Sequence, residues 1–164
     1  MSAVIDAIAG NFIGYDLIIF IIGLVNGFIL YITNIKLKYF REAIYRPNDL
    51  AARKKNEEII DKVTKEDLNK IKKARAEANG YYSIFANVIA IFPLLGLLGT
   101  VISLINVAGD GSFENTQYSF MLSLTSTLWG MIFAILYKIC DARISPEVEM
   151  LNSDAKRAII VQED

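Results

Sequence analysis

Residues 92–103 read FPLLGLLGTVIS and lie within a long apolar run. They include a proline, two glycines, a threonine and a serine. Proline removes a backbone hydrogen bond, and glycine and threonine lower helix propensity. In lipid, such residues are tolerated where neighbouring helices or water satisfy the backbone. We therefore expect one side of this helix to face protein or water, and the function to lie on that side.

The composition of the chain is that of a membrane protein. Of its 164 residues, 54% are apolar, whereas soluble domains reach about 45–50% even with glycine included. Mean hydropathy is +0.37. Of the 17 Lys and Arg residues, 13 fall between Lys36 and Arg75, and none lies in residues 1–35 or 76–137. Because a soluble protein distributes its charges over its surface, the blocks without basic residues indicate membrane segments.

Three membrane spans are predicted, at residues 17–32, 84–107 and 118–137. Each approaches the roughly 20 apolar residues needed to cross ~30 Å of hydrocarbon. Phe12 and Ile13 can extend the first span, which is short in its uninterrupted part. No basic region precedes it, so we expect a retained helix rather than a cleaved signal peptide.

The basic residues predict the orientation, because they accumulate on the cytoplasmic side of membrane proteins. This rule places the insert 36–80 and the C-terminal tail in the cytoplasm. The N-terminus, with Asp6 and Asp16, and the loop 109–117 carry only acids and are expected outside. The predicted location is the cytoplasmic (inner) membrane, crossed several times, and the basic insert is expected near anionic lipid headgroups.

The predicted fold is an all-α membrane protein with three transmembrane helices, the second and third extended into the cytoplasm. We expect the first helix to continue to about Tyr45 and the second to run from residue 65 to 107. Pro146 is expected to interrupt the tail. The predicted parts are an outside N-terminus with the first span (1–35), a cytoplasmic helical insert (36–80), a channel hairpin (81–140) and a cytoplasmic tail (141–164).

Small and hydroxyl-bearing residues form one helical stripe on each of the second and third spans, at spacings of 3 and 4. Tight helix packing explains a single stripe. Two stripes favour a second interpretation, in which they line a space filled by another helix or by water. Spans two and three contain no Asp, Glu, Lys or Arg, so a proton-carrying group is expected to come from a partner. The candidate lining residues are Pro93, Thr100, Ser103, Ser123 and Thr127, and the candidate packing residues are Gly96, Gly99 and Gly130.

Gly23 and Gly27 of the first span form a small-xxx-small pattern, which lets helix backbones approach each other. We favour helix packing over a pore role for this pair. Enzymatic activity, a metal site and a cofactor are not expected, since the chain has no histidine and Cys140 is its one cysteine. Acids interleave with the basic run, which argues against nucleic-acid binding.

Two segments resemble a known family. Residues 93–101 read PLLGLLGTV, and residues 127–131 read TLWGM. They are similar to the P-x-x-G-L-x-G-T/A-V and T-x-x-G-L patterns in the last two membrane helices of the MotA/TolQ/ExbB proton-channel family. The resemblance covers about residues 80–140, and the predicted topology agrees over the rest of the chain.

The resemblance implies a homopentamer whose second and third spans surround a dimer of a MotB/ExbD/TolR-like single-span partner. The partner contributes a protonatable membrane aspartate, and proton flow drives rotation. Thr100 and Thr127 match the family positions that face this aspartate, and Pro93 matches a helix-kinking proline. The resemblance thus implies the ion-channel, or stator, subunit of a proton-driven motor, with Na⁺ as a second candidate ion.

The chain departs from the family pattern in three places. Residues 134–137 read AILY where many members have A-I-P-A, and Leu122 stands where one branch has glutamate. The insert is also shorter than in typical members. These departures leave open which process is driven, such as motility, outer-membrane transport or defence. The alternative function is a non-motor membrane channel or an assembly scaffold without an ion-driven partner.

Overall fold

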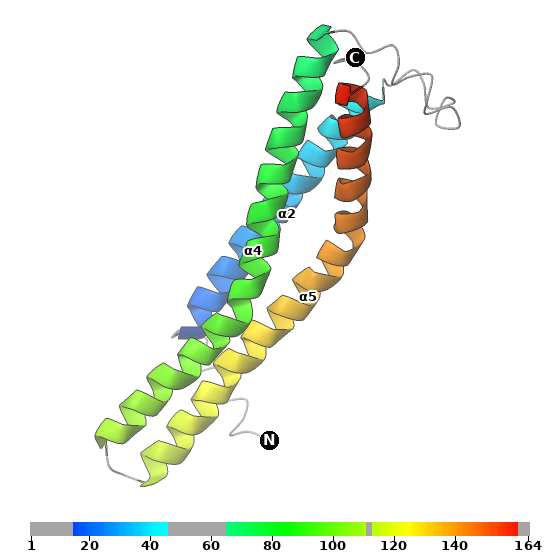
Figure 1. Ribbon diagram of the computed structural model, residues 1–164. Coiled ribbons are helices and arrows are strands. Elements are labelled where there is room, and N and C mark those ends of the chain that lie inside the picture. Colours follow the sequence, from blue (N-terminus) through cyan, green and yellow to red (C-terminus); the bar gives the residue numbers. More distant parts are fainter. Residues whose placement is uncertain (1–14, 46–64, 111–112, 161–164) are drawn as a thin grey trace. The chain divides into compact units, whose positions relative to one another are not determined.

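The structure is a computed structural model that describes residues 15–45, 65–110 and 113–160, without the side chains of residues 65–67, 106–119, 122 and 123. Three helices make up nearly all of this described part: α2 (Tyr15–Ile44), α4 (Lys65–Asp110) and α5 (Phe113–Ile160) (Figure 1). No strand occurs within these ranges. Each helix contains a segment long and apolar enough to cross a membrane. The predicted all-α fold with three such helices is confirmed.

The helix ends agree with the sequence in some places and differ in others. α2 ends at Ile44, next to the expected Tyr45, and α4 begins at Lys65 as expected. The predicted loop 109–117 is too long, because α4 continues to Asp110 and α5 begins at Phe113.

The expected break at Pro146 is wrong, since this proline lies inside α5. Pro146 is exposed, so its ring projects away from the other helices, while Ile144 and Val148 beside it are buried. Their burial holds the helix together across the missing backbone hydrogen bond.

The helices contribute to two compact units. One, here the membrane unit, comprises residues 1–28 and 86–140, and the other, the basic unit, comprises residues 29–85 and 141–164. These boundaries divide α2, α4 and α5, so each helix supplies one segment to each unit. In the membrane unit, the second half of α4 runs side by side with the first half of α5 (Figure 1).

An apolar core holds the basic unit together. Its residues recur at spacings of 3 and 4 on each helix, which places one narrow apolar stripe per helix among many charges. Alanines on α4 keep that helix close to its neighbours. The buried core consists of Leu37, Phe40 and Ile44 on α2, Ile71, Ala74 and Ala78 on α4, and Ile144, Val148, Leu151 and Ala155 on α5.

Polar pairs at the rim of this core fix the register of the helices. Asn79 and Asn152 exchange two amide hydrogen bonds of 2.8 and 2.9 Å, and Arg75 Nε donates to Asn152 Oδ1 at 2.9 Å. Tyr82 donates to Asp141 at 2.8 Å. Such pairs specify one alignment of the helices, because a shifted register leaves the amides without partners.

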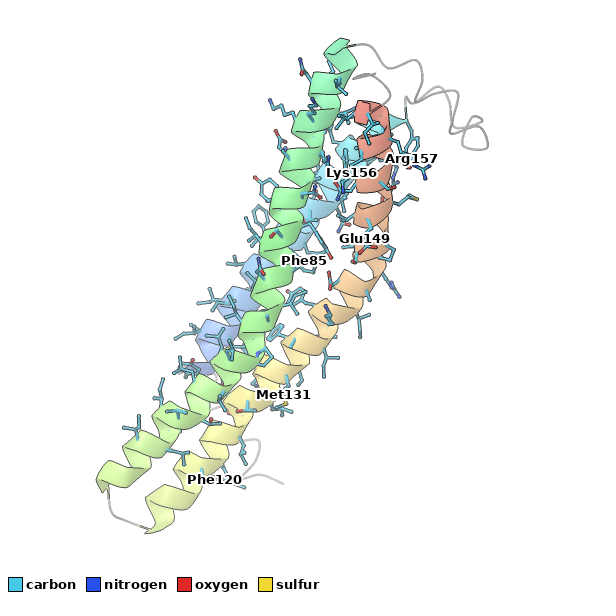
Figure 2. All side chains as sticks on the ribbon, viewed as in Figure 1. Phe85, Phe120, Met131, Glu149, Lys156 and Arg157 are labelled. Carbon is cyan, nitrogen blue, oxygen red and sulfur yellow. The ribbon has the colours of Figure 1, made fainter. Side chains whose placement is uncertain are left out.

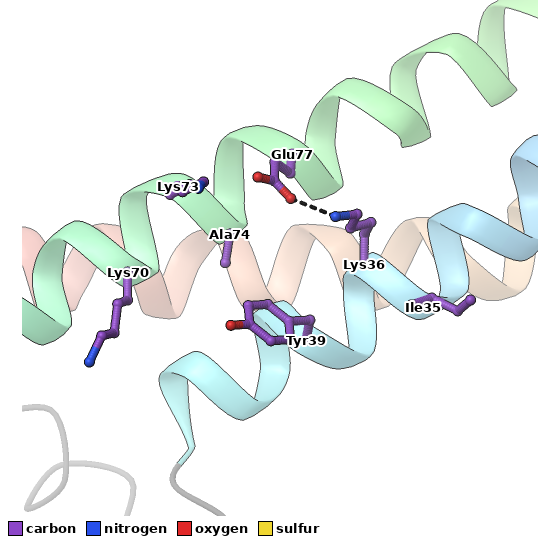
Figure 3. A pocket seen from close by; sticks show the side chains of 7 residues that line it. All are labelled: Ile35, Lys36, Tyr39, Lys70, Lys73, Ala74 and Glu77. Carbon is purple, nitrogen blue, oxygen red and sulfur yellow. Dashed lines mark hydrogen bonds and ion pairs between the residues drawn. The ribbon is translucent and has the colours of Figure 1, made fainter.

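Lys36 and Glu77 form an ion pair of 2.7 Å at a groove of about 410 Å³ (Figure 3). The hydrogen bond and charge of Lys36 lower the pKa of Glu77, and Glu77 in turn raises the pKa of Lys36. Because the pKa of Glu77 is lower in the folded chain than in the unfolded chain, its ionised form stabilises the fold at pH values above the unfolded-state pKa. This stabilisation is lost as the pH falls through the folded-state pKa. Both side chains are about one third exposed, so the pair contributes little.

Leu151→Ala tests the core of the basic unit. Leu151 is fully buried, whereas its neighbour Met150 is 47% exposed. Removing a buried leucine costs about 2–5 kcal/mol because a cavity remains. We expect Leu151→Ala to lower the thermal unfolding midpoint of the full chain in detergent. Met150→Ala is the control and should change it little; equal effects of the two substitutions would contradict this core.

Candidate functional site

The candidate site lies in the membrane unit, where the backbones of α4 and α5 approach each other at two glycines. A Cβ on Gly130 would lie 2.5 Å from the carbonyl oxygen of Phe92, and a Cβ on Gly96 would lie 2.9 Å from Thr127 Cα. No real side chain tolerates such distances to backbone atoms. The contact therefore depends on the absence of a side chain at both positions.

A threonine hydroxyl lies at this contact, and a second lies one helical turn along α4. Thr127 Oγ1 donates to the carbonyl oxygen of Gly96 at 3.1 Å, across the two helices. Thr100 Oγ1 donates to Leu97 O, on its own helix, at 2.6 Å. Both threonines are partly exposed. A hydroxyl that donates one hydrogen bond can still accept others, so each threonine can also interact with a group outside this chain.

The residues of the predicted stripe on α4 differ in how far they are buried. Gly96 is buried against α5, Thr100 and Ser103 are half-buried, and Pro93 is exposed. Spacings of 3 and 4 drift slowly around an α-helix, because its period is 3.6 residues. Pro93 and Thr100 therefore lie at the edge of the buried face rather than at its middle. On α5, the side chain of Ser123 lies outside the described residues.

The glycines of α2 accommodate aromatic rings rather than a second backbone. A Cβ on Gly23 would lie 2.9 Å from the ring of Phe133, and one on Gly27 would lie 3.1 Å from the hydroxyl of Tyr137. Tyr137 donates this hydroxyl to Gly23 O at 2.6 Å. The two glycines thus act in helix packing through the side chains of α5, in a way that their spacing alone does not reveal.

Stacked and edge-on rings connect the three helices of the membrane unit. Phe20 of α2 packs edge-on against Trp129 and Phe133 of α5, with ring centroids 4.7 and 5.3 Å apart. Phe92 of α4 stacks on Phe133 and Tyr137 at 5.5 and 5.6 Å. Such pairs add to the stability of the contact beyond the area they bury. They hold α2 next to the glycine contact.

Sequence reasoning did not predict the burial of Asp16. Asp16 was expected in the outside N-terminal segment, but its side chain is fully buried. Ser126 Oγ donates to Asp16 Oδ1 at 2.5 Å, and Thr125 Oγ1 donates to Asp16 Oδ2 at 3.0 Å. The sequence did contain a signal: Thr125, Ser126 and Thr127 are consecutive, so their hydroxyls cannot all point to one side of a helix.

Comparison with known proteins identifies the family. Residues 31–156, which are 126 of the 164 residues, match the MotA/TolQ/ExbB proton channel family. The chain belongs to this family. Searches of curated proteins and of solved structures return no significant match. With its three apolar helices, this member of the family is a multi-pass membrane protein, and the match includes Thr100, Thr127 and the glycines of the α4–α5 contact.

Gly130→Ala tests the close contact of α4 and α5. The added methyl group would meet a backbone oxygen, which cannot move aside as a flexible side chain can. Overpacking of this kind costs about 1–3 kcal/mol. We expect a lower thermal unfolding midpoint in detergent.

The control is Gly80→Ala, also within α4, where an added Cβ meets nothing within 4 Å. Alanine is a better helix former than glycine by about 0.5–1 kcal/mol, so this substitution should raise the midpoint. A Gly130→Ala variant as stable as Gly80→Ala would show that the backbones do not approach this closely.

Proposed function

We propose that this chain is the proton-channel, or stator, subunit of a membrane motor that couples the proton motive force to mechanical work. The observation that carries the proposal is the family match over both motif-bearing helices, combined with the inter-helix hydrogen bond from Thr127 to Gly96. This hydrogen bond holds the Thr127 hydroxyl at the α4–α5 contact, in a stretch of membrane helix without charged residues. A hydroxyl in such a place can hydrogen-bond a passing carboxyl group without carrying charge itself.

The proposed assembly is a homopentamer around a dimer of a MotB/ExbD/TolR-like single-span protein. Apolar side chains that remain exposed on the membrane unit support it, because they require lipid or protein around them. Phe120 and Met131 project outward from α5 (Figure 2) and are each 52% exposed. On α4, Leu94 and Leu97 are 63% and 58% exposed. These faces supply apolar surface for neighbouring copies, for the partner's helix pair and for lipid.

Each candidate residue has a role in this proposal. Thr100 and Thr127 line the ion path, together with Ser103 and Ser123, and Pro93 shapes α4. The partner's protonated aspartate can donate its hydrogen to a threonine hydroxyl. After deprotonation, the same hydroxyl can turn and donate to the carboxylate. The threonine hydroxyls can thus hydrogen-bond the partner's aspartate in both its protonated and its ionised form.

The proposed orientation has the N-terminus outside and the C-terminus in the cytoplasm, in the cytoplasmic (inner) membrane. The support is the concentration of Lys and Arg in the insert and the tail. The transported ion is H⁺, with Na⁺ as the second candidate, and the chain itself holds no cofactor and is not an enzyme. Its function is to provide the wall along which the ion moves.

Thr127→Val tests the role of the hydroxyl. Valine has nearly the same shape but neither donates nor accepts, so assembly should remain while proton flux falls about tenfold or more. The measurement is proton uptake by vesicles that contain the chain and a single-span partner with a membrane aspartate. Thr127→Ser, which keeps the hydroxyl, is the control and should retain most of the flux. Normal flux through the valine variant would show that this hydroxyl does not serve the ion path.

A further inference from the structure

Asp16 is a buried acid that the proposed motor does not use. Its carboxyl group is fully buried and accepts hydrogen bonds from Ser126 at 2.5 Å and Thr125 at 3.0 Å. It is also the one Asp, Glu, Lys or Arg residue in the apolar segments that build the membrane unit, which are residues 15–28, 86–109 and 115–137.

The contacts of Asp16 place it deep along the helices. Its partner Ser126 lies beside Gly99, where a Cβ would be 2.9 Å from Ser126 Oγ. Gly99 lies 11 residues before the end of α4 at Asp110, and Ser126 lies 13 residues after the start of α5 at Phe113. At 1.5 Å per residue, these separations are roughly 16 and 20 Å. The carboxyl group therefore packs well away from the ends of α4 and α5 at Asp110 and Phe113.

The surroundings of Asp16 are polar but not charged. α5 presents the Thr125 and Ser126 hydroxyls to it, and α4 presents Gly99 beside Ser126. Tyr15, on the same helix as Asp16, also reaches Gly99, with Cδ1 2.8 Å from the place of a Cβ there. Within the described part of the membrane unit, neither α4 nor α5 supplies Asp16 with a Lys or Arg partner. An ionisable residue inside the membrane without a cation is costly and is usually functional.

The two hydroxyls suit a carboxyl group that changes its protonation state. When Asp16 is ionised, Ser126 and Thr125 can both donate to it. When it is protonated, one of the hydroxyls can turn and accept the carboxyl proton, because a hydroxyl is both a donor and an acceptor. A permanent ion pair would instead have supplied Lys or Arg. The hydrogen-bond partners can therefore satisfy both forms without a movement of the helices.

We propose that Asp16 is an intramembrane proton-binding site of this chain. The Asp16 carboxylate takes a proton from hydronium on the outer side and later releases it to water or to the partner's carboxylate along the ion path. The use of that proton for transport rests on the proposed function. The binding of the proton by Asp16 does not. Asp16 would then be a second proton-binding carboxyl group, on this chain, in addition to the membrane aspartate of the partner. The family match begins at residue 31, so Asp16 lies outside the matched segment.

Infrared spectroscopy of the full chain in lipid, with ¹³C-labelled aspartate carboxyl groups, tests the binding directly. We expect an isotope-shifted band of a protonated carboxyl group that grows as pH is lowered. The band should be missing in Asp16→Asn, displaced in Ser126→Ala and unchanged in Asp154→Asn, an acid of the basic unit. If Asp16→Asn does not fold, the shift in Ser126→Ala still assigns the band. A spectrum without such a band, or with one that Ser126→Ala does not move, overturns the proposal.

Proton flux in vesicles with the partner separates this inference from the proposed function. We expect Asp16→Asn to lower flux at least tenfold and Asp16→Glu, which keeps the acid, to retain a substantial part. If Thr127→Val lowers proton flux but Asp16→Asn does not, the channel function stands. Asp16 then only stabilises the packing of α2 against α5, and the proton-binding proposal is wrong. If Na⁺ removes the carboxyl band at constant pH, the site binds Na⁺ and the proton proposal is wrong.

Discussion

The close approach of α4 and α5 at Gly96 and Gly130 is the constraint on which the rest of the membrane unit depends. Because no Cβ separates the two backbones, the Thr127 hydroxyl reaches a carbonyl on the neighbouring helix. The same approach brings Phe92 onto the rings of Phe133 and Tyr137. A hydroxyl-lined contact and an aromatic cluster therefore follow from two missing side chains, in a medium where unsatisfied polar groups are expensive.

Different kinds of interaction stabilise the two units. The membrane unit uses glycine, hydroxyl and aromatic contacts, because hydrophobic burial gives little driving force between helices in lipid. The basic unit uses a conventional apolar core, with Phe40 and Leu151 fully buried, and amide pairs such as Asn79–Asn152 at its rim. The same three helices pass through both units, so each helix changes its packing residues along its length.

Much of the fold could be predicted from the sequence, because hydropathy and charge distribution are strong signals for membrane helices. The three spans and the start of α4 at Lys65 are examples. Pro146 was predicted wrongly, since the burial of Ile144 and Val148 outweighs a local breaker. The burial of Asp16 was not predicted, because an acid at the start of an apolar run resembles a residue at the membrane surface. Only the packing of α2 against α5 shows that Ser126 encloses it.

An electron-microscopy map of the complex purified with its partner tests the central claim most directly. The account predicts five copies of this chain around a central pair of partner helices. Thr100 and Thr127 of the copies should face that pair at the level of the partner's membrane aspartate. A monomer, a dimer or a ring with no central helices would contradict the account.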